Sequence, residues 1–248
     1  MAKSYSLSVL GLGDMLAAGC STDNQTPKAL NFVYSKALVN DIKKLVTAEV
    51  RHFDACDTLA NMACDFSTTE AVFIEVNAPE TVNDSLELLK HIRTINQAAC
   101  IYILVTHNKS FNGIHHYLAG ADHCIKLPVD PQEKQALLLR TFAESHWATT
   151  THLTLDRTRP LLCSASQKIE ISYTEMIIID ALIQAPQHVL SQDSIAKTLD
   201  PNIVFYDPRA LEKTISRLRI KIKKAYHLEL IFSVRTFGYR LRRGTIAQ

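Results

Sequence analysis

The sequence predicts two domains of different fold class, an α/β domain followed by an α+β domain. Segments with strand and helix patterns alternate through residues 29–145, which favours a parallel sheet surrounded by helices. Short strands, three helices and a final hairpin follow in residues 153–243. The charge balance also changes, because residues 1–149 hold 12 Lys/Arg and 16 Asp/Glu whereas residues 150–248 hold 15 Lys/Arg and 9 Asp/Glu. The second region is therefore the one expected to face nucleic acid.

Length and composition exclude several classes of protein. A chain of 248 residues with 47% hydrophobic residues has room for one large or two ordinary folded domains, and it is not typical of a disordered protein. No apolar run reaches the ~18 residues of a membrane span, so no membrane partner is expected. The six cysteines form no CxxC pair and no metal-binding spacing with histidine. We therefore expect reduced thiols in a cytoplasmic protein, without a metal or a cofactor.

The first domain is predicted at residues 29–145, after an extension at residues 1–28 that we expect to pack on this domain or on a partner. Each predicted strand is a short apolar run, and each predicted helix has apolar residues at helical spacing. The predicted strands are residues 30–35, 71–76, 100–106 and 122–126. The predicted helices are residues 39–50, 85–93, 112–119 and 131–145. This alternation is typical of a flavodoxin-like α/β domain.

Residues 146–152 have no periodic apolar face and form the predicted linker to the second domain, residues 153–243. Ser172 and Ser191 suit the first free amides of two helices, and Pro208 suits an early position of a third. The predicted helices are residues 174–184, 191–199 and 208–225. The predicted strands are residues 153–155, 161–163 and 169–171, followed by a hairpin of residues 228–234 and 238–242 and a tail at residues 244–248. This order of elements predicts a winged helix-turn-helix.

The helix predicted at residues 208–225 has two distinct faces. Its apolar stripe consists of Leu211, Ile215, Leu218 and Ile222, spaced by three or four residues. A neighbouring face carries Lys213, Arg217, Lys221 and Lys224, and an aromatic and basic segment follows at residues 235–243. A cationic helix beside a basic hairpin can enter the major groove of DNA while it holds phosphates, so double-stranded DNA is the predicted partner. The alternative is a solvated basic face.

Four motifs of the second domain, at residues 171–175, 189–193, 215–219 and 234–241, resemble those of the OmpR/PhoB family of response-regulator transcription factors. Thr236 stands where the family usually has glycine. An alternative role for Arg219 is to hold its helix in place through Glu212 or other acids of the domain. The resemblance implies DNA-contacting or adjacent positions at Arg209, Lys213, Thr214, Ser216, Arg217, Arg219, Lys221, Arg235 and Tyr239.

The first domain resembles the receiver domain of the same family more weakly, with residues 120–128 as its best anchor. A working receiver needs two acids for Mg²⁺, a phosphoacceptor aspartate, a lysine and a hydroxyl. The corresponding residues are Ser35 and Lys36, Glu75, Leu127 and Thr106, so only the hydroxyl is retained. We therefore expect no phosphotransfer. Glu75 is either a permanent negative charge paired with a lysine or an ordinary polar residue at a strand end, and one carboxylate is a poor copy of a phosphoryl group.

Three consecutive leucines, Leu137, Leu138 and Leu139, lie on the last predicted helix of the first domain. Together with Phe142 they cannot all face one core, because successive residues are rotated by ~100° around a helix. Leu137 stands where the family usually has an arginine that forms salt bridges across a dimer. We expect these leucines to form an apolar dimer face; the alternative is that the N-terminal extension covers them.

These observations predict a sequence-specific, phosphorylation-independent transcriptional regulator that is not an enzyme. It is expected to act as a homodimer on the nucleoid in the bacterial cytoplasm. One alternative is a signalling adaptor that contacts RNA polymerase or another regulator, and another is a two-component response regulator that is still phosphorylated.

Overall fold

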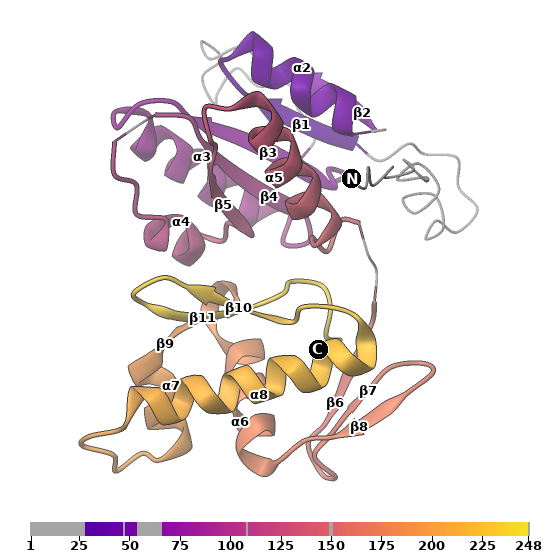
Figure 1. The fold of residues 1–248 in the computed structure, drawn as a ribbon, viewed down its shortest axis with the longest axis vertical. Helices are drawn as coiled ribbons and strands as arrows, with labels where there is room; N and C mark the ends of the chain where they lie inside the picture. Colours follow the sequence, from indigo (N-terminus) through magenta and orange to yellow (C-terminus); the bar gives the residue numbers. More distant parts are fainter. Residues whose placement is uncertain (1–27, 47, 54–65, 108, 149–150, 248) are drawn as a thin grey trace, which may run out of the picture.

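The computed structural model describes residues 28–46, 48–53, 66–107, 109–148 and 151–247. They form two domains, which Figure 1 shows one above the other. The predicted extension at residues 1–28 lies outside the described residues except for Lys28, which begins the first strand. The predicted fold class, a parallel α/β domain followed by a winged helix-turn-helix, is confirmed.

The sheet of the first domain has the strand order β2-β1-β3-β4-β5, and every neighbouring pair is parallel. The central strands β3 and β4 are buried at every position, which explains their nearly continuous apolar sequence because helices cover both faces. The strands are β1 Lys28–Phe32, β2 Glu49–His52, β3 Ala71–Val76, β4 Cys100–Val105 and β5 His123–Lys126.

Helices cover the two faces of this sheet. Alternate side chains of a strand point to opposite faces. Phe73 and Tyr102 accordingly pack in one core with α2 and α5, whereas Ile74 and Ile103 pack in a second core with α3. The helices are α2 Lys36–Leu45, α3 Thr81–Ile95, α4 Ile114–Ala119 and α5 Pro131–Ala143.

One predicted helix has the wrong bounds. We expected a helix at residues 39–50, whereas α2 begins at Lys36 and ends at Leu45. Residues Glu49–His52 form the edge strand β2, which pairs with β1. Three of its four residues are exposed, so its short polar sequence carries little strand signal. Pairing within the folded sheet decides its conformation.

The second domain contains two small antiparallel sheets, β6-β7-β8 and β10-β11-β9. Strand β9 was not predicted; it pairs with the hairpin strand β11. The strands are β6 Thr154–Asp156, β7 Leu161–Cys163, β8 Lys168–Glu170, β9 Val189–Ser191, β10 Ile231–Val234 and β11 Gly238–Leu241. The helices are α6 Tyr173–Gln184, the 3-10 turn η2 Pro186–His188, α7 Gln192–Leu199 and α8 Pro208–Tyr226. Among the described residues, no helix is long and apolar enough to cross a membrane.

Helix α8 packs its apolar stripe into the core of the second domain. All four predicted stripe residues are buried there, together with residues of α6, α7 and the hairpin. The helix starts at Pro208, and the Asp207 side chain caps it by accepting a hydrogen bond from Arg209 N. In α6, Ser172 and Glu175 form a reciprocal capping box. These caps define where both helices begin.

The two domains contact each other through α4 and β5 of the first domain and the hairpin β10–β11 of the second (Figure 1). The Arg240 guanidinium lies 5.4 Å from the centre of the Tyr117 ring across this boundary. The rings of His123 and Phe232 are 6.3 Å apart. Helix α8 lies on the far side of the hairpin, so the first domain does not cover its outer face (Figure 1).

His116 on α4 couples the stability of the fold to pH. Its side chain is fully buried, and its Nε2 atom lies 2.9 Å from Ser85 Oγ. Burial disfavours the charged imidazolium and lowers the pKa of His116 to about 4, with a smaller contribution from the neighbouring His115.

We expect the free energy of unfolding to fall as the pH is lowered from 6.5 towards 4. In this range the unfolded chain binds a proton at His116 but the folded protein does not, so each pH unit costs at most ~1.4 kcal/mol of stability. Urea unfolding at a series of pH values measures this slope. His116→Gln, which retains a polar partner for Ser85, should reduce the slope, whereas His115→Gln at the exposed neighbouring position should retain most of it. An unchanged slope in His116→Gln would contradict the assignment.

Candidate nucleic-acid interface

The outer side of α8 is basic. Four of the predicted contact residues, Arg209, Lys213, Ser216 and Arg217, are exposed, and the helical repeat puts them on one side of the helix. Lys223 and Lys224 continue this side toward the end of α8. We call this surface the basic face; it consists of Arg209, Lys213, Ser216, Arg217, Lys223 and Lys224.

Arg219 is directed to the hairpin and not to the basic face. Its Nε donates to the Ile231 carbonyl at 2.7 Å, and one terminal nitrogen donates to Ser233 Oγ at 3.0 Å. Its guanidinium also lies 5.5 Å from the ring centre of Tyr239, which is only 4% exposed. Arg219 therefore positions α8 against β10, and Tyr239 has no surface to offer DNA. This corrects the expectation that both residues contact DNA.

Two other predicted contact residues are engaged within the domain. Lys221 Nζ lies 2.6 Å from the Glu175 carboxylate and ties α8 to the start of α6. Thr214 is half-buried, and its hydroxyl donates to the Ala210 carbonyl one turn earlier. The polar groups of both side chains thus already have partners, which the helical repeat of the sequence could not reveal.

The wing is the turn that joins β10 and β11. Arg235 is exposed there, beside a cleft of about 300 Å³ that the wing forms with α4 and the loop before it. Thr236 has φ of +60°, a left-handed conformation that β-branched residues rarely adopt and that glycine adopts freely. At Gly238 a Cβ atom would lie 2.1 Å from the Leu190 carbonyl oxygen, so close pairing of β11 with β9 requires glycine at this position.

Three arginines at the end of the hairpin serve the domain boundary. Arg240, Arg242 and Arg243 are all buried. Arg240 stacks between aromatic rings of the two domains, and Arg242 donates to the Ser145 carbonyl of the first domain. We expected the basic segment at residues 235–243 to hold phosphates, but these three arginines are unavailable for that role. The sequence does not distinguish an arginine buried at the domain boundary from one exposed to DNA, because both carry the same charge.

Arg243 contacts Asp122, an acidic residue buried just before β5. One oxygen of Asp122 lies 2.6 Å from a terminal nitrogen of Arg93 and also accepts from Ile101 N at 2.9 Å. Its other oxygen lies 3.2 Å from Arg243 Nε. Burial alone would raise the pKa of Asp122, but the charge of Arg93 holds it below its ordinary value. The ionised carboxylate therefore joins an arginine of its own domain to one of the other domain.

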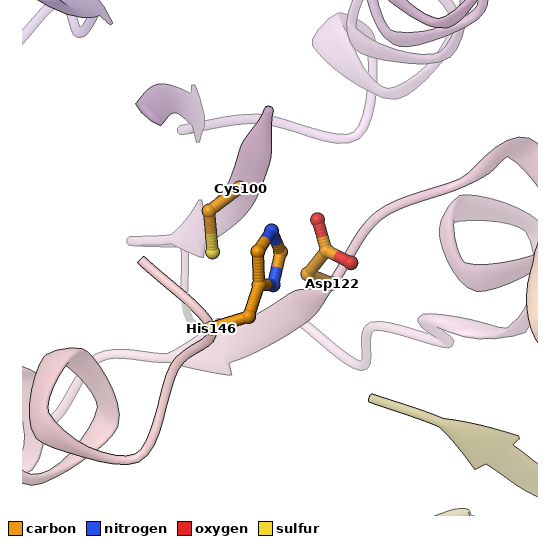
Figure 2. Close-up of side chains that lie close together, drawn as sticks. All are labelled: Cys100, Asp122 and His146. Atoms are coloured by element: carbon orange, nitrogen blue, oxygen red, sulfur yellow. The ribbon is translucent and has the colours of Figure 1, made fainter. Parts of the chain in front are cut away.

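Asp122 also belongs to the cluster Cys100, Asp122 and His146, whose potential ligand atoms lie within 4.8 Å of one another (Figure 2). Both Asp122 oxygens already face guanidinium groups, which supply the positive charge that a metal ion would bring. Burial raises the pKa of the Cys100 thiol to about 12, so the thiolate needed for metal binding is disfavoured. His146 Nε2 donates to the Ala98 carbonyl at 3.0 Å. These surroundings suit an ion-pair network and not a metal site.

Glu75 lies near the carboxyl end of β3 and is only 3% exposed. One oxygen of its carboxylate accepts hydrogen bonds from Tyr34 N at 2.7 Å and Ser35 N at 3.0 Å. The other oxygen accepts from the Thr106 hydroxyl at 2.7 Å. The carboxylate thereby connects the turn between β1 and α2 to the end of β4.

The other residues aligned with the receiver pocket have different surroundings. The Ser35 side chain caps α2, and Lys36 is exposed. Leu127 is buried in the core that contains α5. Lys126 Nζ lies 3.5 Å from the Lys109 carbonyl oxygen. The structure thus brings Ser35 and Thr106 to Glu75 and places Leu127 in the hydrophobic core.

The leucines of α5 differ in their exposure. Leu138 is fully buried in the core of the first domain, so it cannot contribute to a dimer face as we expected. Leu137 and Leu139 are half-buried, and Leu137 packs against the same core. The rotation between successive helical residues accounts for the difference.

We expect Arg243→Ala to loosen the contact between the domains while each domain stays folded. The change removes the hydrogen bonds from the second domain to Asp122 and to the Gln97 carbonyl, with an expected loss of about 1–3 kcal/mol in docking free energy. Asp122 keeps its Arg93 partner. Small-angle X-ray scattering should show a larger radius of gyration for Arg243→Ala and an unchanged one for Arg159→Ala, an exposed arginine of the same domain. Equal radii for all three proteins would contradict the role of Arg243.

Comparisons with known proteins match the second domain to a family and most of the chain to response regulators. Residues 166–241 match the family described as "Transcriptional regulatory protein, C terminal". The response regulator MprA of Mycobacterium sp. (strain KMS) is 28% identical over 197 residues, which cover 76% of this chain and 83% of that protein. MprA of Mycobacterium avium (strain 104) is 28% identical over 204 residues, covering 79% and 87%. The structure of DrrB, an OmpR/PhoB homolog of Thermotoga maritima, aligns with 88% of this chain and 99% of that chain at 16% identity and a TM-score of 0.40.

The family match at residues 166–241 spans α6, α7, both strands of the hairpin and the whole of α8 with its basic face. The second domain is therefore a DNA-binding domain of a transcriptional regulator, and the similarity to response regulators extends well beyond it into the first domain. The chain is thus similar to response regulators over about three quarters of its length, and its C-terminal part matches the DNA-binding domain of transcriptional regulators.

Proposed function

We propose that this protein is a sequence-specific transcriptional regulator that binds DNA without being phosphorylated. The observation that carries this proposal is the basic face of α8, whose residues are all exposed. The hairpin lies between α8 and the first domain (Figure 1). Arginine and lysine side chains on such a helix can bond to guanine O6 and N7 and to phosphate oxygens. Arg217 lies in the middle of this face and is the best candidate for a base contact.

Arg219 and Lys221 support this function indirectly. Their bonds to β10 and to Glu175 hold α8 by its inner side, so the orientation of the basic face is defined before DNA binds. A recognition helix that is already ordered loses less conformational entropy on binding. Arg235 of the wing is the candidate for a contact outside the groove that α8 enters.

The surroundings of Glu75 support phosphorylation independence. Transfer of a phosphoryl group to a receiver domain needs an aspartate that attacks the phosphorus, a Mg²⁺ site made of carboxylates, and a lysine. Here the aligned carboxylate is buried and accepts three hydrogen bonds from the protein itself. The two positions aligned with the metal-binding acids are the helix cap Ser35 and the exposed Lys36.

We also propose that the regulator acts as a homodimer on bacterial DNA, with Leu137 and Leu139 in the contact between first domains. Both are half-buried on α5 and retain some apolar surface. Partial exposure of neighbouring apolar side chains favours an interface. In this arrangement DNA binding would depend on the amount of protein and not on a phosphate.

A second candidate function is an adaptor that contacts RNA polymerase or another regulator. Val204 and Phe205 in the loop between α7 and α8 favour it, because they are 83% and 92% exposed. Adjacent apolar side chains this exposed are typical of contacts with another protein.

We expect Arg217→Ala to weaken binding to a DNA site selected from a random library by about 5- to 150-fold, the equivalent of ~1–3 kcal/mol for a lost base contact. The free energy of unfolding should stay within ~0.5 kcal/mol of wild type because Arg217 is exposed. Arg219→Ala should instead lower the free energy of unfolding by roughly 1–3 kcal/mol, since it removes two bonds to the hairpin. Fluorescence anisotropy over a salt series, together with urea unfolding, measures both quantities.

Lys168→Ala is the charge-matched control, because Lys168 is an exposed residue of β8 outside α8 and the hairpin. It should bind the selected site with nearly wild-type affinity. Wild-type protein that shows no preference for any site over competitor DNA would rule out sequence-specific regulation and favour the adaptor.

We expect no phosphoryl adduct on this protein after incubation with a small phosphodonor and Mg²⁺. Intact-mass measurement detects the ~80 Da that one phosphoryl group adds. DNA binding should be the same before and after the incubation. A stable adduct that maps to the first domain, or a gain in DNA affinity, would overturn phosphorylation independence.

A further inference from the structure

Ile220 is a large apolar residue exposed on the outer side of α8. Its side chain is 65% exposed, whereas the other isoleucines of this helix, Ile215 and Ile222, are buried in the core. Ile220 lies four residues after Ser216 and three after Arg217. Lys223 and Lys224 follow it by three and four residues. It therefore lies within the basic face, one helical turn after Arg217.

The chemical surroundings of Ile220 limit what it can contact. Its neighbours on the basic face are polar or positively charged, so this surface is ill-suited to an apolar partner protein. A DNA major groove offers bonding edges for arginine and lysine, and it offers one apolar group, the C5 methyl of thymine. An exposed aliphatic side chain between cationic ones matches that combination.

We propose that Ile220 reads a thymine by packing against its C5 methyl group. This inference rests on the proposed sequence-specific DNA binding and names part of its specificity. A helix rises about 1.5 Å per residue, so Ile220 lies ~4.5 Å along the axis from Arg217. Bases along one strand are spaced by about 3.4 Å, so the thymine lies one or two base pairs from the base that Arg217 contacts.

The test removes the methyl group from the DNA and the side chain from the protein. A site selected with wild-type protein is synthesised with each thymine replaced in turn by uracil, which lacks only the C5 methyl. Affinities are measured for wild type, Ile220→Ala, Ile220→Val and the control Lys168→Ala. Each variant changes an exposed side chain, and circular dichroism and urea unfolding check that the fold is retained.

We expect one thymine-to-uracil replacement to weaken wild-type binding by about fourfold, the affinity equivalent of one buried methyl group. Ile220→Ala should bind the thymine and uracil sites equally well. Ile220→Val, which keeps a branched aliphatic group, should retain most of the discrimination. Lys168→Ala should retain all of it, because Lys168 lies on β8, outside the basic face.

Two kinds of result would overturn the proposal. The first leaves sequence-specific DNA binding intact, and the second does not. If wild type binds the selected site specifically but discriminates no thymine from uracil, or if Ile220→Ala discriminates as well as wild type, Ile220 does not read a methyl group. Sequence-specific binding would then still stand. If wild type prefers no site at all, the proposed function and the role of Ile220 both fail.

Discussion

The arrangement of the two domains depends on the ion pairs that the Asp122 carboxylate forms with two arginines. The carboxylate is buried and shared between Arg93 of the first domain and Arg243 of the second. Each of these ions would be costly to bury alone, because a charge in a protein interior needs a partner. The contact therefore works only when the three groups are together. It holds the hairpin against α4 and β5 and leaves α8 on the outer side (Figure 1).

The arginines of the second domain have three different physical roles. Arg217 is exposed on the basic face, Arg219 is bonded to the hairpin, and Arg243 is buried at the domain boundary. Arginines within about 30 residues of sequence thus differ in function: the first is the candidate for DNA binding, the second positions α8, and the third docks the two domains. The net positive charge of this region therefore overstates the number of cations available to DNA. Arg243 neutralises Asp122 of the first domain, and Arg240 stacks on Tyr117 of that domain.

In the receiver-like domain, the buried carboxylate of Glu75 lies near the carboxyl end of the central strand β3. Glu75 uses its longer side chain to bond with two backbone amides and with Thr106. A carboxylate with three hydrogen bonds from its own fold stabilises the ends of β1, β3 and β4. These three partners are two backbone amides and a hydroxyl, an environment that also suits an ordinary polar residue at a strand end.

Local apolar spacing, caps and turns in the sequence predicted both fold classes, most of the elements and the buried stripe of α8. The helical repeat also placed Lys213 and Arg217 on a basic face, where both are exposed, whereas Arg209 was implied by the resemblance to the family. The folded structure was needed to show that β2 is a strand, that Tyr239 and Leu138 are buried, and that Arg219 and Arg240 are engaged inside the protein. Strand pairing and burial against another domain bring together residues that are far apart in the chain, so no local pattern records which partner a charged side chain will meet.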